Sequence, residues 1–305
     1  MAIATAYTAI NMDNWVFWEP TDASLSTSQI IQVNSITGQQ QVFTGNFIVD
    51  TLNDDLLGGT LFTETYSVNG ITQHTVTGLS HDPISVYNYL VTQNGPGLLS
   101  YLFNGADTMN GSPAADVING YALGDTINGN NGNDVLNGGT GNDTLNGGAG
   151  ADVLNGSSGN DSLNGGAGAD NLQGGDGNDS FVWSSLDTTN NGGAGLADTL
   201  RLAGGGLTLD LRLVSNAKIQ NMEVINLTGT GNNHLKVSIQ EVLDISLNSN
   251  TLRVDGNAGD DVHRGTGWTT GNDQVIGANT YHRYTAPGGA VLLVDSDITS
   301  LIAYA

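Results

Sequence analysis

Nine aspartates recur along the middle of the chain, and every interval between them is nine residues. They are Asp107, Asp116, Asp125, Asp134, Asp143, Asp152, Asp161, Asp170 and Asp179. An apolar side chain stands two residues after each of them, from Met109 to Phe181, and glycines precede each one, as in GGAGADVLN at 147–155. Each repeat is therefore expected to form a glycine-rich turn followed by a short strand whose apolar residue faces inward. A charged carboxylate oxygen beside backbone carbonyls is the ligand chemistry that calcium prefers.

If two repeats make one coil, equivalent turns lie 18 residues apart on the same edge of a stack. A cation between stacked turns could then bind carboxylates of residues i and i+18 together with turn carbonyls. The seven pairs available are 107/125, 116/134, 125/143, 134/152, 143/161, 152/170 and 161/179. All nine aspartates are thus candidate calcium ligands. Zinc and copper are not expected, because the chain has no cysteine and the repeats have no histidine.

The repeats are not expected to fold without the cation. Burying one apolar side chain contributes about 1.5–3 kcal/mol, whereas ordering one residue costs about 1–2 kcal/mol. Two such side chains per 18-residue coil do not offset that cost, and stacked carboxylates repel one another. Calcium-binding free energy should therefore be folding free energy. A flexible Gly/Asn/Ser linker and a meander of Asn-Gly hairpins are two other interpretations. Neither requires the constant register of aspartate and apolar residue.

Both flanking segments have the patterns of β-structure. In residues 1–103, apolar residues alternate with Thr, Ser and Gln, which predicts antiparallel strands at 28–34, 40–49, 57–67 and 71–77. Asp82-Pro83 is typical of a helix start and Asn94-Gly95 of its end, and the apolar segment 98–103 is expected to cover the open end of the stack.

Residues 183–305 return to an ordinary composition. Strands are predicted at 199–202, 207–213, 223–227, 251–254 and 290–294. The sequence from Ser238 to Glu241 predicts a capping box that opens a short helix through Leu243. The chain is thus predicted to be all-β, with a capping domain at 1–103, the repeats at 104–182 and a β-rich domain at 183–305.

The composition excludes two classes of partner. Acids outnumber Lys plus Arg by 30 to 7, giving a formal net charge of −23. A nucleic-acid-binding protein needs a basic surface, and an anionic membrane surface would repel this chain. No apolar run approaches the roughly 20 residues of a membrane span, so no membrane insertion is expected. The first 20 residues lack the basic start and apolar stretch of a signal peptide.

The repeats, above all those from Gly129 to Val182, resemble the RTX family of hemolysin-type calcium-binding repeats, with the pattern GGxGxDxUx. The earlier repeats at 102–110, 111–119 and 120–128 depart from it, because Ala114 and Leu123 replace a glycine and Pro113 intrudes. The resemblance implies a parallel β-roll and export by a type I secretion system that reads an uncleaved C-terminal signal. Residues from Asn232 onward also resemble the terminal domain of large bacterial RTX surface proteins.

The sequence contains no trace of the common hydrolase sites. There is no HExxH and no GxSxG, and the adjacent Ser80-His81-Asp82 is better explained as a loop and helix cap. An iron or haem site among His74, His81, Tyr66 and Tyr87 is an alternative. A further calcium loop of Asp255, Asp260 and Asp261 in VDGNAGDDV is another.

We therefore expect a secreted calcium-binding structural protein of the cell surface or matrix, such as an S-layer subunit, an adhesin module or a self-assembling filament, and not an enzyme. Self-association is the expected interaction, with a cell-surface polysaccharide as a possible partner. The alternative is a secreted enzyme or a haem- or polysaccharide-binding protein whose site lies in residues 1–103.

Overall fold

The computed structural model describes the strands of the N-terminal segment and nearly all of the chain from residue 105 to residue 304, without residues 112 and 248. In the N-terminal segment it describes the backbone of residues 3–6, 22–25, 29–34, 39–50, 55–68 and 71–81. The chain divides into two compact units, Met1–Val153 and Leu154–Ala305. Within the described residues, no helix is long and apolar enough to cross a membrane.

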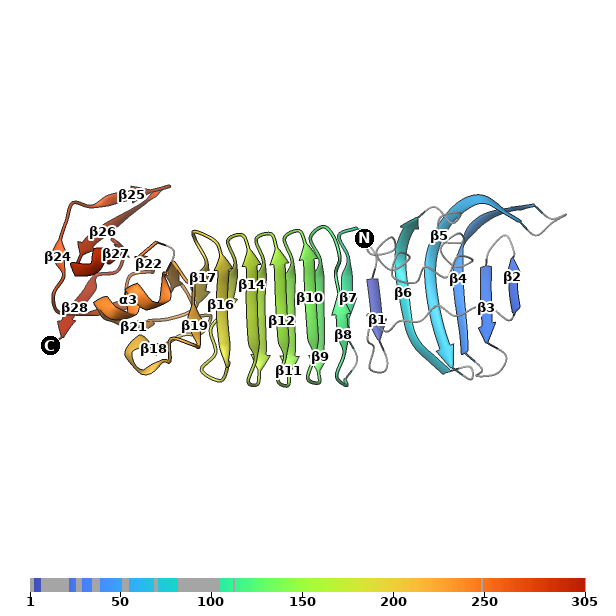
Figure 1. Cartoon of the computed structure of the whole chain (residues 1–305), viewed down its shortest axis with the longest axis horizontal. Helices are drawn as coiled ribbons and strands as arrows, with labels where there is room; N and C mark the ends of the chain where they lie inside the picture. The colour runs from blue at the N-terminus through green and yellow to red at the C-terminus, as the bar shows by residue number, and fades with distance from the viewer. Residues whose placement is uncertain are drawn as a thin grey trace. The chain divides into compact units, whose positions relative to one another are not determined.

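The first unit opens with an antiparallel sheet (Figure 1). Its strands are β2 (Asp22–Leu25), β3 (Gln29–Asn34), β4 (Gln39–Asp50), β5 (Asp55–Val68) and β6 (Ile71–His81), each paired with the next. The four strands predicted from the alternating pattern are confirmed as β3 to β6. The helix predicted between Asp82 and Gly95 and the apolar segment 98–103 lie outside the described residues.

Strand β1 (Ile3–Ala6) joins this sheet to the repeats. It pairs antiparallel with β6 and parallel with β7 (Thr108–Asn110), the strand of the first repeat. A chain segment about one hundred residues earlier in the sequence thus supplies a strand to the edge of the first coil. The sequence pattern did not predict this pairing, since four residues carry no period that specifies a distant partner.

The repeats of the first unit form two parallel sheets. Strands β7, β9 (Thr126–Asn131) and β11 (Thr144–Ala149) pair in one, and β8 (Val117–Asn119) and β10 (Val135–Thr140) in the other. Every pairing joins residues that are 18 apart, such as Thr126 with Thr144. Two repeats therefore make one coil, as predicted, and the arrangement is consistent with a parallel β-roll.

The second unit begins with repeats of the same kind. Its strands include β12 (Val153–Ser158), β13 (Ser162–Ala167), β14 (Asn171–Asp176), β15 (Ser180–Val182) and β16 (Thr189–Ala194). Strand β13 pairs in parallel with β15, and β14 pairs in parallel with β16.

Parallel pairing continues beyond the repeats with longer connections. One sheet runs from β15 through β17 (Thr199–Arg201), β20 (Val224–Asn226) and β22 (Thr251–Asp255) to β27 (Val291–Asp295). A second sheet adds β19 (Ile219–Gln220) to β16. A third contains β18 (Thr208–Asp210), β21 (His234–Val237), β23 (Asp261–Gly265) and β28 (Ser300–Tyr304). Four of the five predicted C-terminal strand regions are confirmed, at β17, β20, β22 and β27. The fifth, predicted at 207–213, is a strand only at Thr208–Asp210, and residues 211–213 form a 3-10 helix instead.

Three antiparallel strands extend the sheet at β27. They are β24 (Thr269–Thr270) and β25 (Gln274–Ile276), which both pair with β26 (Asn279–Thr285), and β26 itself, which pairs with β27. The predicted capping box is present at Ser238 and Glu241, and it opens helix α3 (Ile239–Ile245). Two short 3-10 turns, η2 (Leu211–Leu213) and η3 (Pro287–Gly289), are also among the described elements.

In each unit, single apolar side chains fill the interior of the repeats. They are Met109, Ile118, Ile127, Leu136 and Leu145 in the first unit and Leu154, Leu163, Leu172 and Phe181 in the second, all at most 1% exposed. The prediction that the residue two after each aspartate faces inward is confirmed.

Candidate calcium-binding ladder

The repeat aspartates form ladders in which a carboxylate accepts a hydrogen bond from the backbone N–H of the aspartate 18 residues earlier. The N–H of Asp116 donates to Oδ1 of Asp134, and the N–H of Asp125 donates to Oδ1 of Asp143, both at 2.8 Å. The same bond, at 2.7–2.8 Å, joins the predicted pairs 107/125, 134/152 and 161/179. The structure thus brings together five of the seven predicted pairs. The pairs 143/161 and 152/170 each take one residue from either unit and stay predictions.

The second carboxylate oxygen of the ladder residues is buried. In Asp125, Asp134 and Asp179, Oδ2 has no hydrogen-bond partner among the described residues, and these side chains are at most 2% exposed. Removing a charged oxygen from water without a partner costs several kcal/mol unless a cation or proton neutralises it. The ladder is therefore a column of carboxylates that needs positive charge.

Each buried oxygen faces a glycine-rich turn. A Cβ built on Gly129 would overlap Oδ2 of Asp134 and lie 2.7 Å from the carbonyl oxygen of Gly147. A Cβ built on Gly174 would likewise overlap Oδ2 of Asp179. Glycine at this place leaves a carboxylate oxygen and a carbonyl oxygen on the same side of the turn. That is a mixed set of oxygen ligands of the kind calcium binds.

The turns need left-handed backbone, which glycine supplies at Gly148 (φ 108°). In the divergent repeat at 120–128, Tyr121 (φ 72°) and Leu123 (φ 69°) adopt the same region despite their side chains. The coil geometry thus persists where the glycine pattern fails, and the bond from Asp107 to Asp125 is present there as elsewhere. The strain falls on the substituted residues.

Burial controls the electrostatics of the ladder. Desolvation raises the pKa of Asp125 to about 7, with repulsion from Asp143 and Asp107 acting in the same direction. Desolvation likewise raises the pKa of Asp179 to about 7 and that of Asp134 to about 6. A divalent cation beside these groups would lower their pKa again by favouring the charged form.

The carboxylates alone do not make a complete coordination shell. Within the described residues, no group of three or more His, Cys, Asp and Glu side chains is placed to hold a metal ion. A cation in the ladder must take its remaining ligands from backbone carbonyls or water. The prediction of two carboxylates plus turn carbonyls stays a prediction.

Sequence reasoning missed a second ladder of amide side chains. Asn128 Nδ2 donates to Asn110 Oδ1 at 2.9 Å, and Asn146 Nδ2 donates to Asn128 Oδ1 at 3.0 Å. Asn137 Nδ2 donates in the same way to Asn119 Oδ1 at 2.8 Å. The sequence did carry a signal for this asparagine ladder, because an asparagine stands three residues after each of the aspartates from Asp107 to Asp143.

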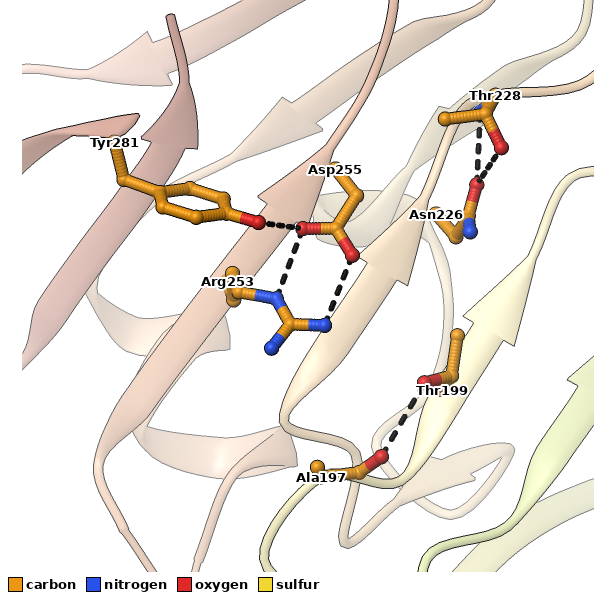
Figure 2. Close-up of polar contacts among 7 residues, drawn as sticks. All are labelled: Ala197, Thr199, Asn226, Thr228, Arg253, Asp255 and Tyr281. Atoms are coloured by element: carbon orange, nitrogen blue, oxygen red, sulfur yellow. Dashed lines mark hydrogen bonds and ion pairs between the residues drawn. The ribbon is translucent and has the colours of Figure 1, made fainter. Parts of the chain in front are cut away.

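The three carboxylates of VDGNAGDDV do not form the further calcium loop that was considered. Asp255 is held by Arg253 at 2.8 Å and by the hydroxyl of Tyr281 at 2.9 Å (Figure 2). Asp260 accepts the N–H groups of Asn233 and Asn257. The carboxylate of Asp261 lies beside His234 and His263. Each carboxylate therefore has different partners.

The alternative iron or haem site falls largely outside the described residues. Tyr66 is the register partner of His74 between β5 and β6, and His81 is the register partner of Leu61. These statements concern the backbone, and Tyr87 lies outside the described residues. The alternative stays a hypothesis.

Comparison with protein-family models decides the nature of the repeats. The RTX calcium-binding nonapeptide repeat matches residues 101–122, 120–154 and 146–181. Residues 101–181 are RTX calcium-binding nonapeptide repeats. RTX repeats bind calcium ions, and proteins that carry them are typically secreted by type I systems. A search of curated proteins finds no match to the chain.

Proposed function

We propose that this chain is an extracellular structural protein whose repeats fold around calcium and whose folded form assembles at the cell surface or in a matrix. The observation that carries the calcium part is the buried, unbonded Oδ2 of Asp125, Asp134 and Asp179 within the described residues. Each lies against a glycine turn that also presents a carbonyl oxygen. The RTX repeats support secretion through a type I system.

Free calcium is low inside cells and high outside them. Because the carboxylate column needs a cation, the repeats should remain unfolded before export and fold after it. Folding outside the cell would also prevent the chain from returning through a narrow exporter. Secretion and calcium binding are in this way two parts of one mechanism.

The structural role rests on charge and on strand edges. The net charge of −23 keeps calcium-free chains apart. Filling all seven predicted sites would add about 14 positive charges and remove more than half of that repulsion. Antiparallel strand β2 has one described pairing partner, β3, and parallel strand β28 has one, β23. Such edges can pair with another chain, so assembly should begin at the calcium concentration at which the repeats fold.

The test is size-exclusion chromatography and negative-stain microscopy of the full chain across a calcium titration. Assembly into a lattice or fibre at millimolar calcium, with magnesium ineffective, is the expected result. A folded, calcium-saturated monomer at high protein concentration would contradict the structural role and favour a secreted enzyme or binding protein with its site in residues 1–103. A polysaccharide partner would then be sought by pull-down on cell-wall material.

A further inference from the structure

The carboxylate ladder continues beyond the last nonapeptide repeat. The N–H of Asp179 donates to Oδ1 of Asp198 at 2.8 Å, and the N–H of Asp198 donates to Oε2 of Glu223 at 3.1 Å. These steps span 19 and 25 residues in place of 18. Both acids lie beyond residue 181, where the family match ends. Two carboxylates outside the repeats thus accept the same kind of backbone bond.

Both new carboxylates are buried and keep one oxygen unbonded. Asp198 is 0% exposed and Glu223 is 4% exposed. Oδ2 of Asp198 and Oε1 of Glu223 have no hydrogen-bond partner in the part of the chain that the structure describes. Desolvation, aided by the negative charge of Asp198, raises the pKa of Glu223 to about 7.

Backbone carbonyls approach the same carboxylate. A Cβ built on Gly192 would lie 2.5 Å from Oδ2 of Asp198 and would overlap the carbonyl oxygen of Asn221. A Cβ built on Gly195 would lie 2.6 Å from both carboxylate oxygens of Asp198 and would overlap the carbonyl oxygen of Gly177. The first of these arrangements repeats that of Gly129, Asp134 and Gly147, with Asn221 supplying the carbonyl.

The geometry of Asn221 is fixed. Its backbone is left-handed (φ 51°), and its Nδ2 donates to Oδ1 of Asn191 at 2.8 Å. The carbonyl oxygen is thereby held toward Gly192 although the residue is not a glycine. A non-glycine residue in this conformation indicates that the surrounding contacts determine it.

The buried acid Asp187, in the same unit, has different surroundings. Its carboxylate Oδ2 accepts from the Ser184 N–H and from Asn190 Nδ2, both at 3.3 Å. The positive charge of Lys218 also acts to lower its pKa, although burial leaves it raised to about 6. No ion pair among the described residues involves Asp198 or Glu223. Asp187 also keeps one oxygen, Oδ1, with no hydrogen-bond partner among the described residues, but the positive charge of Lys218 offsets part of its negative charge.

We propose that Asp198 and Glu223 bind one calcium ion outside the nonapeptide repeats, with the carbonyl oxygen of Asn221 as a further ligand. Two carboxylates balance the charge of the ion, and an all-oxygen ligand set is what calcium prefers. The ion links the turn before β17 to the turn before β20, where the coil lengthens. It thereby attaches the repeats of the second unit to the C-terminal sheets.

The test counts calcium ions in the full chain by equilibrium dialysis against calcium, with atomic absorption of the dialysed protein. Glu223→Gln keeps the size of the side chain and removes its charge. We expect one calcium ion fewer per chain than in the unmodified protein. Glu241→Gln, in the capping box of α3, is the matched control and should bind the same number as the unmodified protein. An unchanged count in Glu223→Gln would overturn the proposal and leave a buried protonated glutamate as the explanation.

A second measurement covers the case in which Glu223→Gln does not fold. Crystals of the unmodified chain grown in calcium chloride should show an anomalous-scattering peak between the carboxylates of Asp198 and Glu223. Peaks in the repeats with none at this place would overturn the proposal while leaving the proposed function intact. Absence of calcium from the whole chain would instead contradict the proposed function itself.

Discussion

The same backbone-to-carboxylate hydrogen bond occurs in the repeats, between Asp116 and Asp134, and in the C-terminal region, between Asn233 and Asp260. Among the described residues, the second carboxylate oxygen is unbonded at Asp134 in the repeats and hydrogen-bonded at Asp260 in the C-terminal region. In both, a backbone N–H donates to Oδ1 of an aspartate one coil later, at 2.8 and 2.7 Å. Oδ2 of Asp134 then lies buried with no hydrogen-bond partner among the described residues, whereas Oδ2 of Asp260 accepts the N–H of Asn257 at 2.7 Å.

The surroundings of Asn233 complete this contrast. Its side-chain oxygen accepts the N–H of Leu207, and its Nδ2 donates to the carbonyls of Gly204 and Leu227. The C-terminal step is therefore satisfied by the protein alone, while the repeat step needs an ion. One backbone geometry serves a metal-dependent region and an independent one, and the placement of a single oxygen decides between them.

The repeats and the C-terminal region also differ in how much apolar surface their strands bury. In the repeats each short strand buries one side chain of its apolar column, such as Leu136 in β10. In the C-terminal region, β27 buries three successive apolar side chains, from Leu292 to Val294. The C-terminal region can thus be stabilised by burial, and the repeats cannot.

Leu136→Ala and Leu292→Ala test this difference with the largest expected effect. Both side chains are 0% exposed, so each substitution should lower the free energy of unfolding by about 2–5 kcal/mol at saturating calcium. In chelator, we expect the effect of Leu292→Ala to persist and that of Leu136→Ala to vanish, because the repeats are then already unfolded. Urea titration followed by circular dichroism measures both. An equal loss of stability in Leu136→Ala with and without calcium would contradict the claim that the repeats, unlike the C-terminal region, fold only around the ion.

Asp134→Asn and Asp260→Asn should act in opposite directions in the absence of calcium. Asp134→Asn removes a buried charge while keeping an oxygen for the N–H of Asp116, so it should favour the calcium-free fold and weaken calcium binding at least tenfold. Asp260→Asn turns an acceptor of the Asn257 N–H into a donor and should cost about 1–3 kcal/mol with or without calcium. Isothermal titration calorimetry and thermal unfolding measure the two quantities. Similar behaviour of the two variants would show that the placement of the second oxygen is unimportant.

Calcium binding should weaken as the pH falls from about 8 to about 6. Burial raises the pKa of Asp125 and of Asp179 to about 7, above the ordinary value of 3.8, so the calcium-free fold binds protons that the unfolded chain does not. The calcium-free fold should consequently gain stability as the pH falls through about 7 toward 4, while protons compete with calcium. Calcium titrations at several pH values measure the midpoint. A midpoint that does not move between pH 8 and pH 6 would contradict the buried-carboxylate account.

Leu123→Gly is expected to have the smallest effect, and a stabilising one. Leu123 has a φ of 69° and is 57% exposed, so glycine would relieve backbone strain and lose little packing. The expected gain is about 0.5–1 kcal/mol at saturating calcium. Leu196→Gly is the matched control, because Leu196 is 79% exposed and its φ is not positive, and it should be neutral or destabilising. A loss of stability in Leu123→Gly would mean that the side chain contributes contacts that outweigh the strain.

The repeats could be predicted from sequence because their contacts are periodic. A constant interval of nine places each aspartate and each apolar residue without knowledge of the partner strand. The interval of nine does not predict Asp198, because GGAGLAD contains one extra residue before the aspartate. It does not predict Glu223 either, because the coil between Asp198 and Glu223 has 25 residues. The signal for Asp198 was present in its glycines, whereas nothing local in the sequence marks Glu223.

The C-terminal strands were predicted individually, but their stacking was not. Strand β20 pairs with β22 and β22 with β27, across connections of different lengths. The partners of such strands are set by tertiary packing, which local alternation does not encode. The same reason explains VDGNAGDDV, where Asp255, Asp260 and Asp261 are close in sequence and have unrelated partners.

Hydrogen exchange of the full chain, followed by mass spectrometry in EGTA and in millimolar calcium, tests the central claim most directly. Amides of the repeats at 105–182 should exchange freely in EGTA and become protected in calcium, with magnesium ineffective. Amides of β22, β23 and β27 should be protected under both conditions, because their region contains the satisfied Asn233–Asp260 step and the apolar interior. Protection of the repeats in EGTA equal to that in calcium would contradict the claim that the aspartate ladder folds around the ion.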